Sequence, residues 1–249
     1  MNDTNIHKLS ELFTIRQEQV DINKNAHITS ILDLCLEMAH KHANMLGVGF
    51  DNLKKLNCFW VLSRMNVHIY GYPKWEDKIR ISTVPKFDNG MFAYRDFKVE
   101  FENGDTIANI SSSWLTITAD TKKIIKPSSI LEENQYSGKL HDEKEAPKLQ
   151  SLMTIKAENF EPVSFFDVDV NAHVNSIAYL RHAIAAFGIS FLSQHTLHEI
   201  SVNYIKETTP NSNIGVAIDK INSNIYKVQV YSDPETISCI CELNFNQKR

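Results

Sequence analysis

The feature that most constrains the fold of this chain is an internal repeat. The stretch VDINKNAHITSILDL, which begins at Val20, can be laid over FDVDVNAHVNSIAYL, which begins at Phe166. The overlay pairs residues that are 146 positions apart and places Asn25-Ala26-His27 on Asn171-Ala172-His173. Several identities at one fixed spacing are the signature of a repeated structural unit. We therefore expect two related lobes.

Each copy is followed by the same order of predicted elements. Apolar residues recur at helical spacing, which predicts one long helix with a buried stripe in each lobe. The stripe residues are Ile28, Ile31, Leu32, Cys35, Ala39, Ala43 and Leu46 in the first copy and Ile177, Leu180, Ile184, Phe187 and Phe191 in the second. Strand-like runs follow at 60–72, 78–84, 91–104 and 106–118, and again at 198–207, 214–221, 226–232 and 236–245. Turn signals such as Asn103-Gly104 separate these runs.

This order predicts an α+β fold in which each lobe is an antiparallel sheet wrapped around one long helix. The stretch from Asp120 to Leu149 is rich in Lys, Glu, Ser, Asn and Pro and shows little periodicity, as is typical of a surface connection. We place the first lobe at residues 1–130, a linker at 131–150 and the second lobe at 151–249.

Composition and charge narrow the class of protein. The chain is 43% hydrophobic and 22% charged with a net charge of −4, which is typical of a globular protein and disfavours binding to nucleic acid. The first residues lack a basic start followed by an apolar run, and no run reaches the roughly 18 apolar residues of a membrane span. We expect a cytoplasmic protein without membrane insertion.

The cysteines Cys35, Cys58, Cys239 and Cys241 show no metal-ligand spacing. They predict reduced thiols that are buried or half-buried. We expect neither a metal nor a cofactor.

A cluster of polar residues directly before the second predicted helix carries the candidate chemistry. Asp169, Asn171 and His173 alternate, so on an extended segment they would face one side. They would bring a carboxylate, an amide and an imidazole beside a helix start, whose N–H groups suit a developing oxyanion. Asp and Asn before a helix are also typical turn formers and caps, and Asn175 and Ser176 are candidates for the N-cap.

The repeat helps to separate chemistry from capping. In the overlay Asp169 falls on Asn23, and an asparagine cannot act as a base or a nucleophile. We therefore expect the chemistry to reside in the second lobe.

The segment FFDVDVNAHVNSIAYL resembles the Asp-x-Asn-x-His-Val-Asn motif of plant and bacterial acyl-[acyl carrier protein] thioesterases, which are double hot-dog proteins. The segments FWVLSRMNV, YPKWED (72–77) and SSSW (111–114) resemble that family in the same order. The resemblance extends from about Phe13 to Phe245 and implies a tandem hot-dog fold.

The resemblance implies an enzyme that hydrolyses the thioester joining a fatty acyl chain to acyl carrier protein, releasing free fatty acid and ending chain elongation. It implies a further acidic site residue, Glu207, in the segment YIKET. The cysteine that often follows this glutamate in plant members is Thr208 here, which cannot form a thiolate. Matching Pro73 to Pro210 places Tyr70 opposite Glu207, so we expect the first lobe to lack both carboxylates.

The resemblance also assigns an apolar tunnel for the acyl chain to the first lobe. The candidates to line it are Met45, Phe59, Trp60, Met65, Phe92 and Trp114, and ordinary core packing is the alternative for each. The implied partner, acyl carrier protein, is acidic, so a local basic face is expected. Candidate cations are Arg181, Lys206, Lys122, Lys123 and Lys126. The oligomeric state is left open, with a homodimer as one option.

Three other functions are compatible with the sequence. A hot-dog acyl-CoA thioesterase would share the fold and the reaction but use another carrier. A hot-dog hydratase or dehydratase also pairs a histidine with a carboxylate, although the Asp-x-Asn-x-His order and the later Glu207 argue against it. A non-catalytic acyl-binding protein would bind the chain without releasing free fatty acid.

Overall fold

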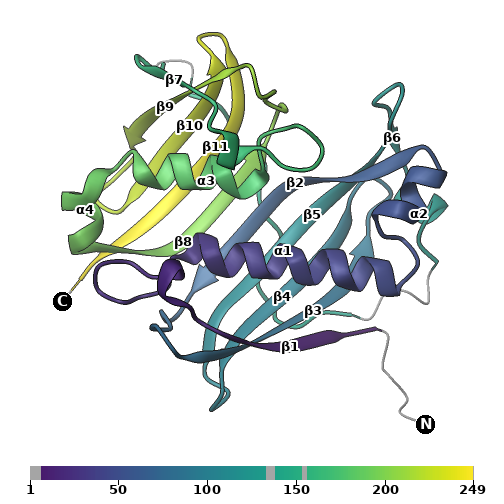
Figure 1. Cartoon of the computed structure of the whole chain (residues 1–249), viewed down its shortest axis with the longest axis horizontal. Helices are drawn as coiled ribbons and strands as arrows, with labels where there is room; N and C mark the ends of the chain where they lie inside the picture. Colours follow the sequence, from purple (N-terminus) through teal and green to yellow (C-terminus); the bar gives the residue numbers. More distant parts are fainter. Residues whose placement is uncertain (1–6, 133–137, 153–155, 249) are drawn as a thin grey trace. The chain divides into compact units, whose positions relative to one another are not determined.

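The computed structural model describes residues 7–132, 138–152 and 156–248. The chain divides into two compact units, unit 1 at residues 1–63 and 67–145 and unit 2 at residues 64–66 and 146–249. Each unit combines an antiparallel sheet with helices (Figure 1), which confirms the predicted α+β class.

Unit 1 is built on strands in the order β1-β3-β4-β5-β2, with β6 beside β5. Its elements are β1 (Leu9–Thr14), η1 (Gln17–Gln19), α1 (Ile28–Met45), α2 (Phe50–Lys55), β2 (Cys58–Ile69), β3 (Lys78–Asp88), β4 (Ala93–Phe101), β5 (Thr106–Thr118), β6 (Ile124–Ile125) and η2 (Pro127–Ser129). The long first helix and the strands after it are confirmed.

The core of unit 1 lies between α1 and the sheet. Ile31, Leu32 and Met38 of α1 are almost fully buried, as are Ile81 of β3 and Phe97 of β4. Figure 1 shows α1 lying across the strands of this unit. Burying each such side chain stabilises the fold by about 1.5–3 kcal/mol.

Unit 2 repeats this plan with strands in the order β8-β11-β10-β9-β7. Its elements are β7 (Phe160–Pro162), η4 (Phe165–Asp167), α3 (Ser176–Ala185), α4 (Gly188–Gln194), β8 (His195–Tyr204), β9 (Asn213–Lys220), β10 (Ile225–Asp233) and β11 (Thr236–Gln247). The four predicted strands are confirmed.

The expectation of one long helix in the second lobe is wrong. The helix ends at Ala185, and α4 continues at an angle of 91° to α3. Gly188 at the break has φ +74°, a backbone conformation that glycine adopts without steric cost. The bend lets Phe187 and Phe191 pack around Phe245, with ring centroids 4.9 and 5.1 Å from it. Aromatic packing at the end of the sheet therefore interrupts the helical stripe.

Within the described ranges, no single helix has both the length and the apolar composition to cross a membrane. The helices α3 and α4 reach that length and apolar composition only when they are counted together across their bend.

All four cysteines are buried free thiols, as expected.

The segment that ends unit 1 is held to the sheet by a buried group of charges. Asp96 of β4 is fully buried, and its carboxylate accepts the N–H of Leu140 at 3.2 Å. Lys86 Nζ lies 3.4 Å from Asp96 and also pairs with Glu145. Burial opposes the charged form of Lys86, but hydrogen bonds and charge from Glu145 and Asp96 outweigh it and raise its pKa. The contribution of the Lys86 ammonium group to stability is therefore present at neutral pH and is lost as pH rises through its raised pKa.

We expect Asp96→Ala to lower the free energy of unfolding by about 3–5 kcal/mol, because it leaves the nearly buried Lys86 ammonium without its innermost partner. Urea denaturation measures this change. Asp142→Ala is the matched control, since Asp142 pairs with Lys139 at the surface, and it should leave the midpoint unchanged. Equal midpoints for the two variants would contradict the prediction.

Candidate active site

The loop between η4 and α3 carries three of the predicted site residues. The N–H of Asp169 donates to the carbonyl of His173 at 2.9 Å, and Asp169 Oδ1 accepts the N–H groups of Asn171 at 2.8 Å and His173 at 3.4 Å. Ala172 has φ +57°. The segment is a tight turn rather than the extended segment that we predicted. The carboxylate of Asp169 favours the turn because it accepts local backbone N–H groups.

The start of α3 fixes the other end of this loop. The side chain of Asn175 accepts the N–H of Ile177 at 2.8 Å, which confirms Asn175 as the N-cap. The backbone N–H of Asn175 donates to the carbonyl of Asp167 at 2.7 Å, and Val168 and Val174 form an isolated β-bridge.

The imidazole of His173 meets the carboxylate of Glu207, which follows β8. His173 Nε2 lies 3.3 Å from Glu207 Oε2, and the two side chains are 31% and 43% exposed. A carboxylate in this place favours the tautomer with hydrogen on Nε2, which leaves the lone pair on Nδ1 to accept a proton. The pair is thus a partly solvent-exposed acid–base group. Asp169 Oδ2 lies 3.5 Å from Asn171 Nδ2 on the same loop.

The sequence did not reveal a second histidine–carboxylate pair. Asp167 Oδ2 lies 2.8 Å from Nε2 of His182, which projects from α3. Asp167 belongs to the polar cluster before the helix, but no motif spacing indicates His182 as its partner. Only the packing of η4 beside α3 brings the two together.

Unit 1 contains the same turn as the site loop. The N–H of Asp21 donates to the carbonyl of Asn25 at 2.8 Å, and Asp21 Oδ1 accepts the N–H groups of Asn23 at 2.8 Å and Asn25 at 3.0 Å. Lys24 has φ +64° and takes the place of Ala172. The two turns match in every one of these hydrogen bonds, and they place Asp169 on Asp21.

This match changes the register of the repeat. The structurally equivalent residues are 148 positions apart, because η1 matches η4, the Val20–Ala26 bridge matches Val168–Val174, and Ile28 at the start of α1 matches Ser176. The overlay at 146 positions is therefore wrong by two residues. It aligned Asn-Ala-His by identity, whereas the Asp carboxylate that closes each turn sets the structural register.

The corrected register changes which site residues the first unit lacks. Asp169 corresponds to Asp21, not to Asn23, so unit 1 keeps this carboxylate. His173 corresponds to Asn25, so unit 1 has an amide at the position where unit 2 has this imidazole.

The counterpart of Glu207 changes as well. The N–H of Val174 donates to the carbonyl of Thr208 at 2.9 Å, and the N–H of Ala26 donates in the same way to Pro73 at 2.7 Å. Glu207 therefore corresponds to Tyr72 rather than to Tyr70. The His173–Glu207 pair therefore has no counterpart at the equivalent positions of unit 1, where Asn25 and Tyr72 stand.

The predicted tunnel residues are only partly brought together. Trp60 packs against the cluster of Leu46, Val48, Ala93 and Leu131, and its indole N–H donates to the carbonyl of Val48 at 3.0 Å. Trp114 pairs with Ala93 across β5 and β4 and so shares its face of the sheet. Of the others, Met65 is 1% exposed and Met45 is 47% exposed, while Phe59 and Phe92 are partly buried.

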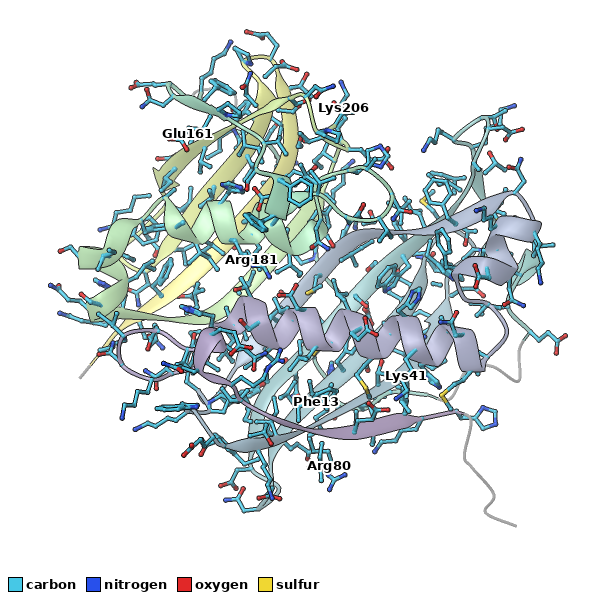
Figure 2. All side chains as sticks on the ribbon, in the orientation of Figure 1. Phe13, Lys41, Arg80, Glu161, Arg181 and Lys206 are labelled. Atoms are coloured by element: carbon cyan, nitrogen blue, oxygen red, sulfur yellow. The ribbon has the colours of Figure 1, made fainter. Side chains whose placement is uncertain are left out.

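The candidate cations for a carrier are all exposed. In unit 2 they are Arg181 on α3 and Lys206, which directly precedes Glu207. Arg181 and Lys206 are labelled in Figure 2. In unit 1 they are Lys122, Lys123 and Lys126.

The protein thus consists of two hot-dog units, and His173 and Glu207 form a histidine–carboxylate pair in the second. The sequence matches the acyl-ACP thioesterase N-terminal domain over residues 7–134 and the acyl-ACP thioesterase C-terminal domain over residues 150–246. The chain therefore belongs to the acyl-ACP thioesterase family, as the sequence motifs indicated.

Individual relatives agree with this family. The chain is 27% identical to the chloroplastic oleoyl-acyl carrier protein thioesterase of Coriandrum sativum, with 85% of this chain and 65% of that protein covered. It is 26% identical to the chloroplastic palmitoyl-acyl carrier protein thioesterase of Gossypium hirsutum, covering 80% of this chain but only 51% of that protein. The chain thus spans between half and two thirds of the length of these plant proteins.

The crystal structure of an acyl-ACP thioesterase from Bacteroides thetaiotaomicron has the same fold. The TM-score is 0.85 at 23% identity, with 96% of this chain and 98% of that chain covered. The double hot-dog fold is confirmed.

Proposed function

We propose that this protein hydrolyses the thioester of fatty acyl-[acyl carrier protein] and releases the free fatty acid, which ends chain elongation. The observation that carries the proposal is the His173–Glu207 pair, which stands in unit 2 and is replaced by Asn25 and Tyr72 in unit 1. Membership of the acyl-ACP thioesterase family supports the substrate class.

In the first step, His173 Nδ1 takes a proton from water while the water oxygen attacks the thioester carbonyl carbon. Glu207 accepts the Nε2–H of His173, orients the ring and stabilises the imidazolium that forms. The carbonyl oxygen becomes an oxyanion, and the Asn171 amide is the proposed donor to it.

In the second step, the tetrahedral intermediate collapses and the carbon–sulfur bond breaks. The imidazolium of His173 returns its proton to the departing phosphopantetheine thiolate, so the products are a fatty acid and the free carrier thiol. Asp169 supplies the second carboxylate. It closes the turn through Oδ1, and its charge lies beside Asn171 and holds that amide in place.

We further propose a division of labour between the lobes. Residues 151–249 carry the chemistry, while residues 1–130 hold the acyl chain, with Trp60 and Trp114 at the apolar cluster near the end of α1 as the best-supported contacts. Lys206 beside Glu207 is the cation best placed to attract the acidic carrier. The four free thiols suit a reducing compartment such as the cytoplasm.

The decisive experiment is a hydrolysis assay on acyl carrier protein loaded with a ladder of acyl chain lengths. We expect free fatty acid to appear, with a higher kcat/KM for the acyl carrier protein substrate than for the matching acyl-CoA. A higher kcat/KM for acyl-CoA would instead make coenzyme A the carrier of the substrate. Binding of acyl carrier protein without any release of fatty acid would overturn the enzymatic function.

Direct attack by water makes a further prediction. A single turnover in ¹⁸O-labelled water should place the label in the released fatty acid and none in the peptide that contains Asp169. The reason is that Asp169 Oδ1 is engaged by two backbone N–H groups, so we assign the carboxylate to positioning rather than to attack. Mass spectrometry of product and digested protein measures both. Label in the Asp169 peptide with unlabelled product would show a covalent anhydride route instead.

A further inference from the structure

The hydroxyl group of Tyr179 is a buried polar group that the proposed reaction does not use. Tyr179 lies on α3 and is 4% exposed. Its hydroxyl oxygen accepts the backbone N–H of Thr208 at 2.9 Å. That N–H belongs to the peptide bond between Glu207 and Thr208. The hydrogen bond therefore fixes the backbone immediately after the proposed acid–base carboxylate.

Thr208 is held by each of its other polar groups as well. It is 1% exposed, and its Oγ1 lies 2.8 Å from the Oγ of Ser238. Its carbonyl accepts the N–H of Val174 at 2.9 Å. Because Val174 directly follows His173, the residues after the two members of the acid–base pair are bonded to one another. Thr208 thus links the backbone of His173 to that of Glu207.

A fixed backbone matters here because the Glu207 carboxylate must reach His173, with Oε2 3.3 Å from Nε2. The carboxylate can do so only while the backbone holds the Glu207 Cα atom within reach of the ring. A shift of about 1 Å at a reacting group can cost about 100-fold in rate.

Unit 1 serves as an internal comparison for this hydrogen bond. Pro73 takes the place of Thr208 and keeps the bond to the N–H of Ala26, at 2.7 Å, but a proline has no N–H to donate. Ile31, which stands 148 positions before Tyr179, has no hydroxyl group. The tyrosine contact therefore has no equivalent in unit 1, which also has no counterpart of the His173–Glu207 pair at the equivalent positions.

We infer that Tyr179 is a positioning residue, whose hydroxyl group holds the Glu207–Thr208 peptide so that the Glu207 carboxylate meets His173. The inference rests on the proposed function, since it concerns the same acid–base pair. Burial raises the pKa of Tyr179, so the phenol stays neutral and keeps its hydroxyl proton over the range of any hydrolysis assay.

The test is Tyr179→Phe, which removes one oxygen and keeps the ring packing. We expect kcat on acyl carrier protein substrates to fall about 10- to 100-fold while KM stays unchanged, since Tyr179 acts on the pair and not on the substrate. The double variant Tyr179→Phe/Glu207→Gln should be no slower than Glu207→Gln alone. If the two residues acted independently, the fold-decrease in kcat of the double variant would be the product of the two single fold-decreases.

Tyr231→Phe is the matched control for the loss of a buried hydroxyl group. Tyr231 is also 4% exposed in unit 2, and its hydroxyl accepts a hydrogen bond from Gln229 Nε2 at 2.6 Å. The two tyrosine variants should lose similar thermal stability, but only Tyr179→Phe should lose kcat. If both keep wild-type kcat, or both lose it equally, Tyr179 has a structural role only and the inference is overturned.

A second variant removes the same hydrogen bond from its other side. Thr208→Pro copies Pro73 of unit 1, deletes the N–H together with the hydroxyl contact to Ser238, and keeps the carbonyl that Val174 uses; Thr208→Val, which removes the hydroxyl contact alone, is its control and should keep kcat. Thr208→Pro should reproduce the kcat loss of Tyr179→Phe, and wild-type kcat in a folded Thr208→Pro protein would count against the inference.

A readout without catalysis separates this inference from the proposed function. The ¹H–¹⁵N signals of the His173 imidazole should change in Tyr179→Phe in the same direction as in Glu207→Gln, and not in Tyr231→Phe. If the wild-type protein hydrolyses no acyl carrier protein substrate but the imidazole signals change as expected, the proposed function is overturned and the positioning role of Tyr179 stands. If hydrolysis occurs and the signals of Tyr179→Phe match the wild type, only the positioning role fails.

Discussion

His173→Ala and Glu207→Gln are each expected to lower kcat/KM for acyl-[acyl carrier protein] by about 10²- to 10⁴-fold, the usual contribution of a general acid–base group. The first change removes the base, and the second removes the carboxylate that lies 3.3 Å from His173 Nε2. Both side chains are partly exposed, so the thermal stability of the variants should stay close to that of the wild type. Steady-state kinetics with one acyl chain length measures the effect.

The internal repeat supplies matched controls for this prediction. Asn25 and Tyr72 occupy the equivalent positions in unit 1, so Asn25→Ala and Tyr72→Phe change the same places in a unit without the pair. Their kcat/KM should remain near the wild-type value. If the unit 1 variants lost as much activity as the unit 2 variants, the assignment of chemistry to unit 2 would be wrong.

Asp169→Asn is expected to lower kcat by about 10²-fold, because the asparagine carbonyl can still accept the turn N–H groups but the negative charge beside Asn171 is lost. Asp21→Asn makes the identical change in the identical turn of unit 1. The two variants should lose equal thermal stability, and only Asp169→Asn should lose activity. Differential scanning calorimetry and the hydrolysis assay measure the two properties separately.

This comparison separates the two readings of Asp169 that the sequence leaves open. If both variants keep full activity, Asp169 is a turn former like Asp21 and the chemistry rests on His173 and Glu207 alone. If both lose activity, the turn itself is needed in each unit. If the Asp169 charge positions Asn171 as proposed, activity is lost in the unit 2 variant only.

The elements that could be predicted from the sequence are those set by local interactions. The strands follow runs of alternating or continuous apolar residues, and the N-cap at Asn175 depends on a side chain two residues from the N–H that it accepts. Periodicity does not predict the break at Gly188, because the apolar stripe continues through it. The aromatic packing of Phe187 and Phe191 around Phe245, far along the chain, decides where that stripe bends.

The register of the repeat cannot be found by aligning identical residues of the two lobes. Asn-Ala-His occurs in both lobes, but its two copies stand at different places relative to the turn. In each of these two turns an aspartate carboxylate accepts the N–H of the residue two positions later, and Asp21 and Asp169 make this same hydrogen bond. Aligning letters therefore placed Asp169 against Asn23 and suggested that the first lobe had lost a carboxylate that it keeps.

Residue order and short-range periodicity are sufficient to predict two related lobes, a helix directly after the polar cluster at Asp169–His173, and the family that the motifs indicate. Three contacts depend on tertiary packing instead: His173 with Glu207, Asp167 with His182, and Tyr179 with the peptide after Glu207. They join residues on different elements, and the distances are set by how α3 packs beside η4 and beside the segment that follows β8.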